Sequence, residues 1–305
     1  MQTAHFFQQF LGSTAGMPAV CMGIKMAFSD EQAERYSRHL ILKEVGITGQ
    51  RKLLNSKVLI IGAGGLGAPA ALYLAAAGIG TIGVADGDDV ELSNLQRQII
   101  HGYGDIGIPK VESARETINK MNGDVKVNTY HMFVTVDNIM DLVKEYDFII
   151  DATDNFETKF LINDACVLAE KPFSHAGVVR FTGQLMTYVP KKGPCYRCIF
   201  DSPPPKGEVP TCREAGVIGA VAGVIGSLQA MEAVKYILGV GELLTGYMLT
   251  YDALKTEFRK IKLPDRVSGC KVCGVSPAIT DIQDDAEMLC SCRVPENCDM
   301  HECKE

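Results

Sequence analysis

Residues 57–78 read KVLIIGAGGLGAPAALYLAAAG, and this stretch decides the fold. Its branched apolar start is typical of a buried strand, and its alanine-rich part, residues 66–78, is typical of a helix. Between the two lie four glycines, three of them in G-x-G-x-x-G spacing: Gly62, Gly64, Gly65 and Gly67. Without side chains, their backbone amides can approach phosphates at a helix N-terminus, where the dipole favours anions. The stretch therefore predicts a nucleotide-binding strand–loop–helix unit.

The rest of the chain continues this alternation of strands and helices. Strands are expected at 81–86, 125–133 and 147–153, and helices at 110–121, 138–146 and 157–170. Such alternation predicts an α/β fold with a doubly wound, mostly parallel, Rossmann-like sheet. Further strands at 172–180 and 183–190, and a hairpin at 247–263 around Asp252-Ala253, extend that sheet with antiparallel strands.

Composition excludes several classes of protein. The chain has 305 residues, 47% of them hydrophobic, and a net charge of −7, which argues against a nucleic-acid-binding face. Eleven cysteines in a chain of this size, some in paired spacing, fit a reduced, cytoplasmic compartment. We expect residues 1–27 to be a mobile extension without an export signal, 28–275 the nucleotide-binding domain, and 276–305 an acidic, Cys-rich tail.

The most membrane-like segment is residues 216–238, GVIGAVAGVIGSLQAMEAVKYIL. Gln229, Glu232 and Lys235 interrupt its second half on one helical face. Because Glu and Lys are costly in the hydrocarbon layer, we expect a buried core or subunit-interface helix and no membrane span.

Polar residues follow the second expected strand. Asp86 ends it, nineteen residues after Gly67, where a carboxylate can accept hydrogen bonds from ribose hydroxyls. These features alone do not separate a dinucleotide from ATP. Arg97 and Lys110 follow closely, and a site that stabilises charge on a triphosphate needs such cations, although either residue alone could be a surface charge. Together they favour ATP over a nicotinamide cofactor.

The fourth strand ends in the motif DATDN, residues 151–155. Ligands of doubly wound sheets bind at the carboxyl ends of strands. We expect Asp154 to hold Mg²⁺ against the phosphates and Asn155 to contact the base or ribose. Asp151 is the other carboxylate in the motif, and bracing the loop is an equally good role for it.

Two Cys-x-x-Cys pairs, Cys195/Cys198 and Cys270/Cys273, lie far apart in the sequence. Four thiolates suit a closed, tetrahedral structural Zn²⁺ site that pins two segments together. A redox pair or chance clustering is the alternative for one pair, but two pairs of equal spacing favour zinc.

Several motifs together resemble the ThiF/MoeB/HesA family of ubiquitin-activating-like adenylyltransferases. They are RYSRH at 35–39, GAGGLG at 62–67, SNLQRQ at 93–98, PKVESA at 109–114, DATDN, PCYRC at 194–198 and GCKVCG at 269–274. The resemblance covers residues 28–280. It implies that the C-terminal glycine carboxylate of a ubiquitin-like sulfur carrier of the MoaD/ThiS type, ending in Gly-Gly, attacks the α-phosphate of ATP. Pyrophosphate leaves and an acyl-adenylate remains, for molybdopterin, thiamine or another sulfur pathway.

The resemblance also implies residue roles. Those assigned to ATP are Gly65, Asp86, Ser93, Asn94, Leu95, Gln96, Arg97, Lys110, Asp154 and Asn155. It assigns the four paired cysteines as zinc ligands. It assigns Arg38 the role of an arginine finger that acts on the site of the other subunit of a homodimer. The attacking carboxylate is already ionised near neutral pH, so no general base is needed, and His39, His101 and His175 are expected to be packing or surface residues.

The cysteines outside the two pairs each have more than one possible role. Arg213 and a helix start can lower the thiol pKa of Cys212, which makes it a candidate for a covalent link to the carrier or for sulfur relay. A bystander role is equally compatible. The tail cysteines can bind a second metal, exchange sulfur, or belong to a disordered polar end.

Two other functions share some of these features. An NAD-dependent oxidoreductase would use the glycine loop and Asp86, but it does not explain Arg97, Lys110, DATDN or the zinc cysteines. A non-catalytic scaffold for a ubiquitin-like protein would not need Asp154, Arg97 and Lys110.

Overall fold

A computed structural model describes residues 27–205 and 212–282. Nearly all of the expected N-terminal extension and most of the acidic tail, including all of the tail cysteines, lie outside the described residues.

The sheet has eight strands in the order β3-β2-β1-β4-β5-β6-β7-β8. The first five strands in that order are parallel to one another and the last three are antiparallel. In chain order they are β1 (Lys57–Ile61), β2 (Thr81–Ala85), β3 (Lys126–Tyr130), β4 (Phe148–Asp151), β5 (Phe173–Val179), β6 (Thr182–Tyr188), β7 (Tyr247–Asp252) and β8 (Glu257–Lys262). The predicted doubly wound sheet with an antiparallel extension is confirmed.

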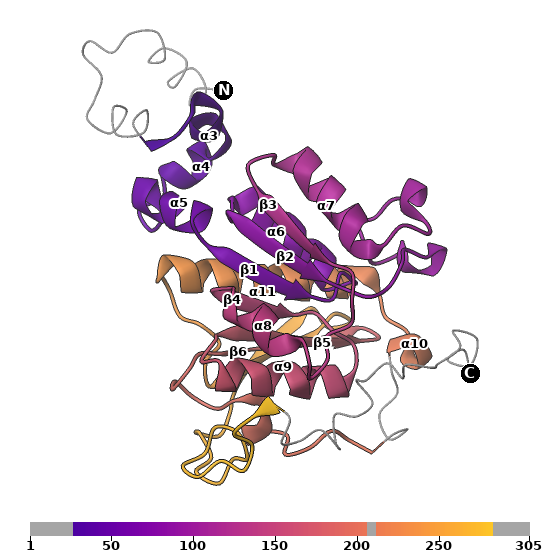
Figure 1. The fold of residues 1–305 in the computed structure, drawn as a ribbon, viewed down its shortest axis with the longest axis vertical. Helices are drawn as coiled ribbons and strands as arrows, with labels where there is room; N and C mark the ends of the chain where they lie inside the picture. The colour runs from indigo at the N-terminus through magenta and orange to yellow at the C-terminus, as the bar shows by residue number, and fades with distance from the viewer. Residues whose placement is uncertain (1–26, 206–211, 283–305) are drawn as a thin grey trace.

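Helices cover both faces of the sheet (Figure 1). One layer contains α6 (Gly67–Ala77), α7 (Lys110–Met121) and α11 (Gly219–Leu238), and the other contains α8 (Ile139–Lys144) and α9 (Phe156–Leu168). In β1, Val58 and Ile60 join the apolar cluster of the first layer, whereas Leu59 and Ile61 join that of the second. Because both faces are buried, this strand is a continuous run of apolar residues and does not alternate with polar ones.

Helix α11 is long and apolar enough to cross a membrane by length and composition alone, but it packs against α6, β5 and β6 in the core. Its polar residues bond to the sheet. The Gln229 side-chain amide donates to the carbonyls of Asp151 and Ser174 at 2.8 and 3.1 Å, and Glu232 accepts from the Thr187 hydroxyl at 2.7 Å. The expectation of a buried core helix therefore agrees with the fold.

Among the described residues, three helices precede β1: α3 (Asp30–Arg35), α4 (Ser37–Leu40) and α5 (Gly46–Leu54). Tyr36 anchors them, because its hydroxyl accepts from the Asn122 amide at 2.9 Å and its ring fills the space beside Gly78. Asn122 follows α7, and Gly78 ends α6 in a left-handed conformation with φ +84°. The N-terminal helices therefore lie at the amino edge of the sheet, opposite the glycine loop.

The remaining elements are short turns of helix: η1 (Leu92–Asn94), η2 (Tyr103–Asp105), η3 (Tyr196–Cys198) and α10 (Cys212–Ala215).

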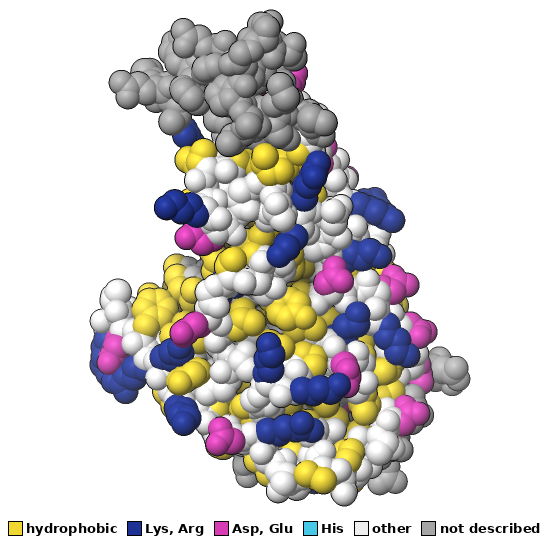
Figure 2. All heavy atoms as spheres, turned by 90° about the vertical axis from the view of Figure 1, so that its left-hand side faces the viewer, with side chains coloured by type: hydrophobic (Ala, Val, Ile, Leu, Met, Phe, Trp, Pro, Cys, Tyr) yellow, Lys and Arg dark blue, Asp and Glu magenta, His cyan; other side chains and the backbone are white. Residues whose placement is uncertain are grey.

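On the face at the left of Figure 1, Lys and Arg side chains are interspersed with Asp and Glu side chains (Figure 2). An open groove of about 880 Å³ at the amino edge is lined in part by Arg51, Lys52, Asp147 and Lys171. It lies across the sheet from the glycine loop.

Candidate nucleotide and metal sites

The carboxyl ends of β1, β2 and β4 meet at one edge of the sheet. Gly62, directly after β1, has φ +99°, and a Cβ there would lie 2.7 Å from the carbonyl oxygen of Ala152, directly after β4. Only glycine allows the two strand ends to approach this closely. In the order β3-β2-β1-β4-β5, this contact is the switch point at which doubly wound sheets bind their ligands.

A side chain is excluded at Gly67 and crowded at Gly65 in the loop from Gly62 to Gly67. A Cβ at Gly67 would overlap the Gly62 carbonyl oxygen, and one at Gly65 would lie 3.3 Å from Ala222 and 3.4 Å from the Arg97 side chain. The loop opens directly into α6, so its amides lie at the positive end of a helix dipole. This is the geometry that a phosphate needs.

His101 contacts the backbone of this loop. Its Nε2 lies 3.1 Å from the Ala63 carbonyl oxygen, and its Nδ1 lies 2.8 Å from the Ser113 hydroxyl, which is 2.8 Å from an Asp105 oxygen. Burial lowers the pKa of His101. The ring is a buried packing residue, as expected, but it also holds the glycine loop through partners that are distant in sequence.

Asp86 lies directly beside the loop. Its carboxylate accepts from the Ala63 amide at 2.7 Å and from the Asp88 amide at 2.9 Å. Lys110 is almost fully buried, with Nζ 2.6 Å from Asp88 and 3.9 Å from Asp86. Burial raises the pKa of the Asp86 carboxyl, and the Lys110 ammonium partly offsets this effect. The structure thus places Lys110 next to Asp86, the carboxylate proposed to bind ribose. Asp88, which pairs with Lys110, was not predicted as a site residue, although the Asp-x-Asp pattern at the end of the strand is visible in the sequence.

The segment after Asp86 folds back along the loop. Arg97 donates to the Ser93 carbonyl at 3.1 Å, and its stem lies against Gly65. Asn94 is buried and its amide oxygen accepts from the Glu91 amide. Leu95 and Gln96 complete the turn, which packs against Gly219 at the start of α11.

Gln98 follows this turn and is a further polar residue at the loop. Its Nε2 lies near Gly64. Its Oε1 is buried without a hydrogen-bond partner among the described residues. A cradle of glycines with an unpaired acceptor beside it fits a ligand that carries both phosphates and donor groups.

The DATDN motif divides its carboxylates between two environments. Asp151 is fully buried and accepts from the Thr153 hydroxyl at 2.7 Å, the Thr153 amide at 3.1 Å and His175 Nδ1 at 2.7 Å, with Lys159 Nζ at 3.4 Å. Burial opposes its ionisation, but Lys159 and the His175 hydrogen bond outweigh that effect and hold the pKa of the Asp151 carboxyl below its usual value. Asp151 is therefore the residue that braces the loop.

Asp154 and Asn155 follow this brace. Asp154 is exposed at the carboxyl edge, where a metal-bound phosphate can reach it. Asn155 is the N-cap of α9, and its amide oxygen accepts from the Thr158 amide at 2.8 Å. Its oxygen therefore caps the helix, and its NH₂ group is the donor it can offer to a nucleotide.

Arg38 is not near this edge in its own chain. It is exposed on α4, beside Tyr36 at the far end of α6. Helix α6 has 11 residues, so its two ends are about 16 Å apart at about 1.5 Å per residue. The side chain of Cys212, at the start of α10, lies outside the described part of the structure.

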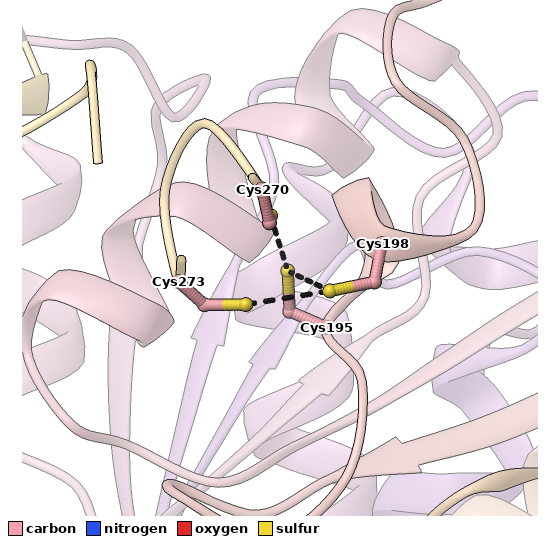
Figure 3. Close-up of side chains that lie close together, drawn as sticks. All are labelled: Cys195, Cys198, Cys270 and Cys273. Atoms are coloured by element: carbon pink, nitrogen blue, oxygen red, sulfur yellow. Dashed lines mark hydrogen bonds between the residues drawn. The ribbon is translucent and has the colours of Figure 1, made fainter. Parts of the chain in front are cut away.

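The four paired cysteines converge on one point (Figure 3). Their sulfur atoms all lie within 4.8 Å of one another, with separations of 3.9 Å for Cys195–Cys198, 3.7 Å for Cys195–Cys270 and 3.4 Å for Cys198–Cys273. A tetrahedral zinc ion with Zn–S bonds of about 2.3 Å requires sulfur separations of about 3.8 Å. The four thiols are free and can hold a metal ion; the two sequence pairs form a single cluster.

One ion pair also links the two knuckle segments, and a further hydrogen bond braces the second knuckle. The Lys271 ammonium lies 2.8 Å from an Asp201 carboxylate oxygen, and this contact links the segment after β8 to the segment after β6. Arg266 donates to the Cys273 carbonyl at 2.6 Å. The cluster therefore pins together the ends of the antiparallel extension.

Comparisons with known proteins place these sites in context. A sequence model of the ThiF family matches residues 36–272 of this chain. "Adenylyltransferase and sulfurtransferase MOCS3" from Culex quinquefasciatus is 45% identical over 263 residues, which are 86% of this chain and 60% of that protein. The proteins of the same name from Dictyostelium discoideum and Bos taurus are 48% and 44% identical, over 83% and 94% of this chain and 60% and 63% of theirs. The chain thus spans about 60% of the length of these relatives.

Solved structures show the same fold. E. coli MccB with ATP superposes with a TM-score of 0.68 at 26% identity, covering 86% of this chain and 83% of that one. E. coli MccB with AMPCPP and MccA gives a TM-score of 0.69 at 27% identity, covering 83% and 76%.

Proposed function

The chain belongs to the ThiF family, and from this premise we propose that it adenylates a ubiquitin-like sulfur-carrier protein. The C-terminal glycine carboxylate of a carrier ending in Gly-Gly attacks the α-phosphate of ATP. A new bond forms between the carboxylate oxygen and phosphorus, and the bond to pyrophosphate breaks. The names of the MOCS3 relatives support the adenylyltransferase activity, and they favour a carrier of molybdopterin synthesis over one of thiamine synthesis.

The single observation that carries this proposal is the meeting of anion-binding, cationic and acidic groups at one strand edge. The glycine loop lies beside Asp86, the stem of Arg97 lies against the loop, and Asp154 faces solvent at the same edge. MccB, which shares the fold, has been solved with ATP. An NAD-dependent oxidoreductase would have no use for this set of charges.

The chemistry is mainly a matter of charge and position. A carboxylate that approaches a triphosphate meets electrostatic repulsion, which Arg97, Lys110 and a magnesium ion offset. Asp154 would hold the Mg²⁺, which supplies positive charge to the phosphate oxygens. The backbone amides of the loop and Asp86 would fix the nucleotide so that the α-phosphate faces the entering carboxylate. The nucleophile is already ionised near neutral pH, so no base is required.

We also propose that the protein works as a homodimer in which Arg38 completes the site of the partner subunit. Within one chain, α6 separates Arg38 from the phosphate loop by about 16 Å along the helix axis. An Arg38 that takes part in the reaction therefore acts on a site other than that of its own chain.

Zinc is the proposed metal of the cysteine cluster, with a structural role. All four ligand positions come from protein sulfur, so no position is left open for a substrate.

We propose that residues 28–275 form this adenylyltransferase domain in the cytoplasm, and that residues 1–27 and 276–305 flank it. Any role of Cys212 would follow adenylation.

Pyrophosphate exchange tests the function. Labelled pyrophosphate should enter ATP only when a carrier ending in Gly-Gly is present, and a carrier without its last glycine should give background exchange. ATP with Mg²⁺ should raise the melting temperature, and NAD should not. A carrier panel that gives no exchange, together with stabilisation by NAD, would reject the proposal in favour of an oxidoreductase.

A further inference from the structure

A buried polar contact connects the nucleotide edge to the cysteine cluster. On one side, His175 Nδ1 donates to the Asp151 carboxylate at 2.7 Å, and that carboxylate holds the backbone and hydroxyl of Thr153 directly before Asp154. On the other side, the His175 ring lies against Tyr196, with centroids 4.2 Å apart. Tyr196 lies between Cys195 and Cys198 in the first knuckle.

Helix α9 makes the same connection along a second route. It begins at the N-cap Asn155, next to Asp154, and its Lys159 ammonium lies 3.4 Å from Asp151. The next residue, Phe160, packs edge-on against Tyr196, with ring centroids 5.0 Å apart.

The last turns of α9 bind the knuckle by hydrogen bonds. The Asn163 amide oxygen accepts from the Tyr196 amide at 2.8 Å. Asp164 accepts from Arg197 through two nitrogens at 2.7 Å, and both side chains are completely buried. The N-cap of α9 therefore directly follows the proposed magnesium ligand, and the same helix contacts the proposed zinc knuckle.

A plain packing role does not explain His175. Its Nε2 is buried and has no hydrogen-bond partner among the described residues. A phenyl ring in the same place would fill the space against Tyr196 without leaving a buried acceptor unpaired. Histidine supplies a ring against Tyr196 and an N–H donor to Asp151 at the same time.

We propose that metal binding at the cysteine cluster and nucleotide binding at the strand edge are energetically coupled, with His175 as the positioning residue between them. The metal fixes Tyr196; Tyr196 fixes the His175 ring; and the ring orients Asp151, which sets the Thr153–Asp154 turn. This inference rests on the proposed nucleotide and metal roles of the two sites. Coupling between sites is reciprocal, so nucleotide must tighten metal binding by the factor by which metal tightens nucleotide binding.

Two substitutions separate the two contacts of His175. His175→Phe keeps a ring against Tyr196 but has no donor for Asp151, whereas His175→Asn keeps an N–H donor and loses the ring. Tyr146→Phe is the matched control, because Tyr146 is a buried, hydrogen-bonded ring on the same side of the sheet whose hydroxyl contacts Tyr130 and Asn128.

The first measurement is calorimetric binding of AMPCPP with Mg²⁺ to the zinc-loaded dimer. Both His175 variants should retain one zinc per chain and bind AMPCPP about tenfold more weakly, within the usual range of coupling between sites. Tyr146→Phe should bind it like the wild type. Should either His175 variant fail to fold, Phe160→Leu removes the α9 ring contact and carries the same prediction.

The second measurement is zinc affinity by chelator competition, with and without AMPCPP. The nucleotide should raise the zinc affinity of the wild type and of Tyr146→Phe by about tenfold, and should leave that of the His175 variants unchanged. A merely structural histidine would change stability without altering this nucleotide dependence. Wild-type zinc affinity that is indifferent to AMPCPP, or unaltered AMPCPP binding in both His175 variants, would overturn the inference. Because neither readout uses the carrier or exchange, failure here is distinguishable from failure of the proposed function.

Discussion

The parallel and antiparallel parts of the sheet end in opposite kinds of site. At the carboxyl edge of the parallel strands, Asp154 and Ser93 are exposed and the glycine loop leaves backbone amides open. At the end of the antiparallel part, Cys195 is 0% exposed, and Arg197, 3% exposed, is paired with a buried Asp164. The first site leaves groups open for an external ligand, whereas the second is enclosed by the chain and has four thiols that could hold one metal ion. We therefore expect changes at the first to affect catalysis and changes at the second to affect folding.

The largest expected effect on stability comes from removing a thiolate. Cys270→Ser should lose the zinc and lower the free energy of unfolding by several kcal/mol, because metal binding free energy contributes to folding free energy. Metal analysis and urea unfolding check this. A Cys270→Ser protein with normal stability and no zinc would show that the knuckles hold together without a metal.

The next effect concerns the proposed second subunit. Arg38→Ala and Arg97→Ala should each be nearly inactive in pyrophosphate exchange. After subunit exchange, half of the dimers carry one intact site and one doubly altered site, so roughly a quarter of wild-type activity should return. Native mass spectrometry verifies the mixing. Complete mixing with no recovery would exclude Arg38 acting across the dimer.

Acid stability separates the buried Asp151–His175 pair from the exposed edge. Burial lowers the pKa of His175, and Lys159 and His175 hold that of Asp151 low, so both groups take up protons on unfolding. Stability should therefore fall as pH drops below about 6.5 through His175 and below about 3.9 through Asp151, by at most about 1.4 kcal/mol per pH unit for each group. His175→Phe should lack the upper part of this slope in urea unfolding between pH 7 and pH 5. The cysteines are unchanged in that variant, so acid release of zinc does not explain a difference.

The smallest effect is expected at Cys212. Cys212→Ala should keep pyrophosphate exchange within about twofold of the wild type, because adenylation precedes any thiol step. Loss of exchange in a folded Cys212→Ala protein would place the thiol before or within adenylation.

Local patterns predicted the parallel half well. The strand–loop–helix unit at 57–78 is contiguous in sequence, so the glycine spacing alone located the turn between β1 and α6. The strand expected at 147–153 is shorter in the structure, because β4 ends at Asp151 where Thr153 turns back to bond it. The cysteine cluster could also be predicted from the sequence, because the two pairs have the same Cys-x-x-Cys spacing although they lie far apart in the chain.

The buried polar contacts could not be predicted from local sequence patterns. His101 and His175 were expected to be packing or surface residues, but their partners are 38 and 24 residues away, at Ala63 and Asp151. Helix α3 was also not predicted, although its capping box of Ser29 and Gln32 is a local signal that the sequence contains. The positions of α3 and α4 at the amino edge depend on Tyr36 meeting Asn122, which only the folded chain reveals.

The division between a catalytic edge and a structural knuckle is tested most directly at Asp154, with exchange and urea unfolding measured on the same samples. Asp154→Ala should reduce carrier-dependent pyrophosphate exchange to background, because the proposed magnesium ligand is lost, while the unfolding free energy stays within about 0.5 kcal/mol of the wild type, as is usual for an exposed side chain. Full exchange by a zinc-loaded, folded Asp154→Ala protein would contradict the account.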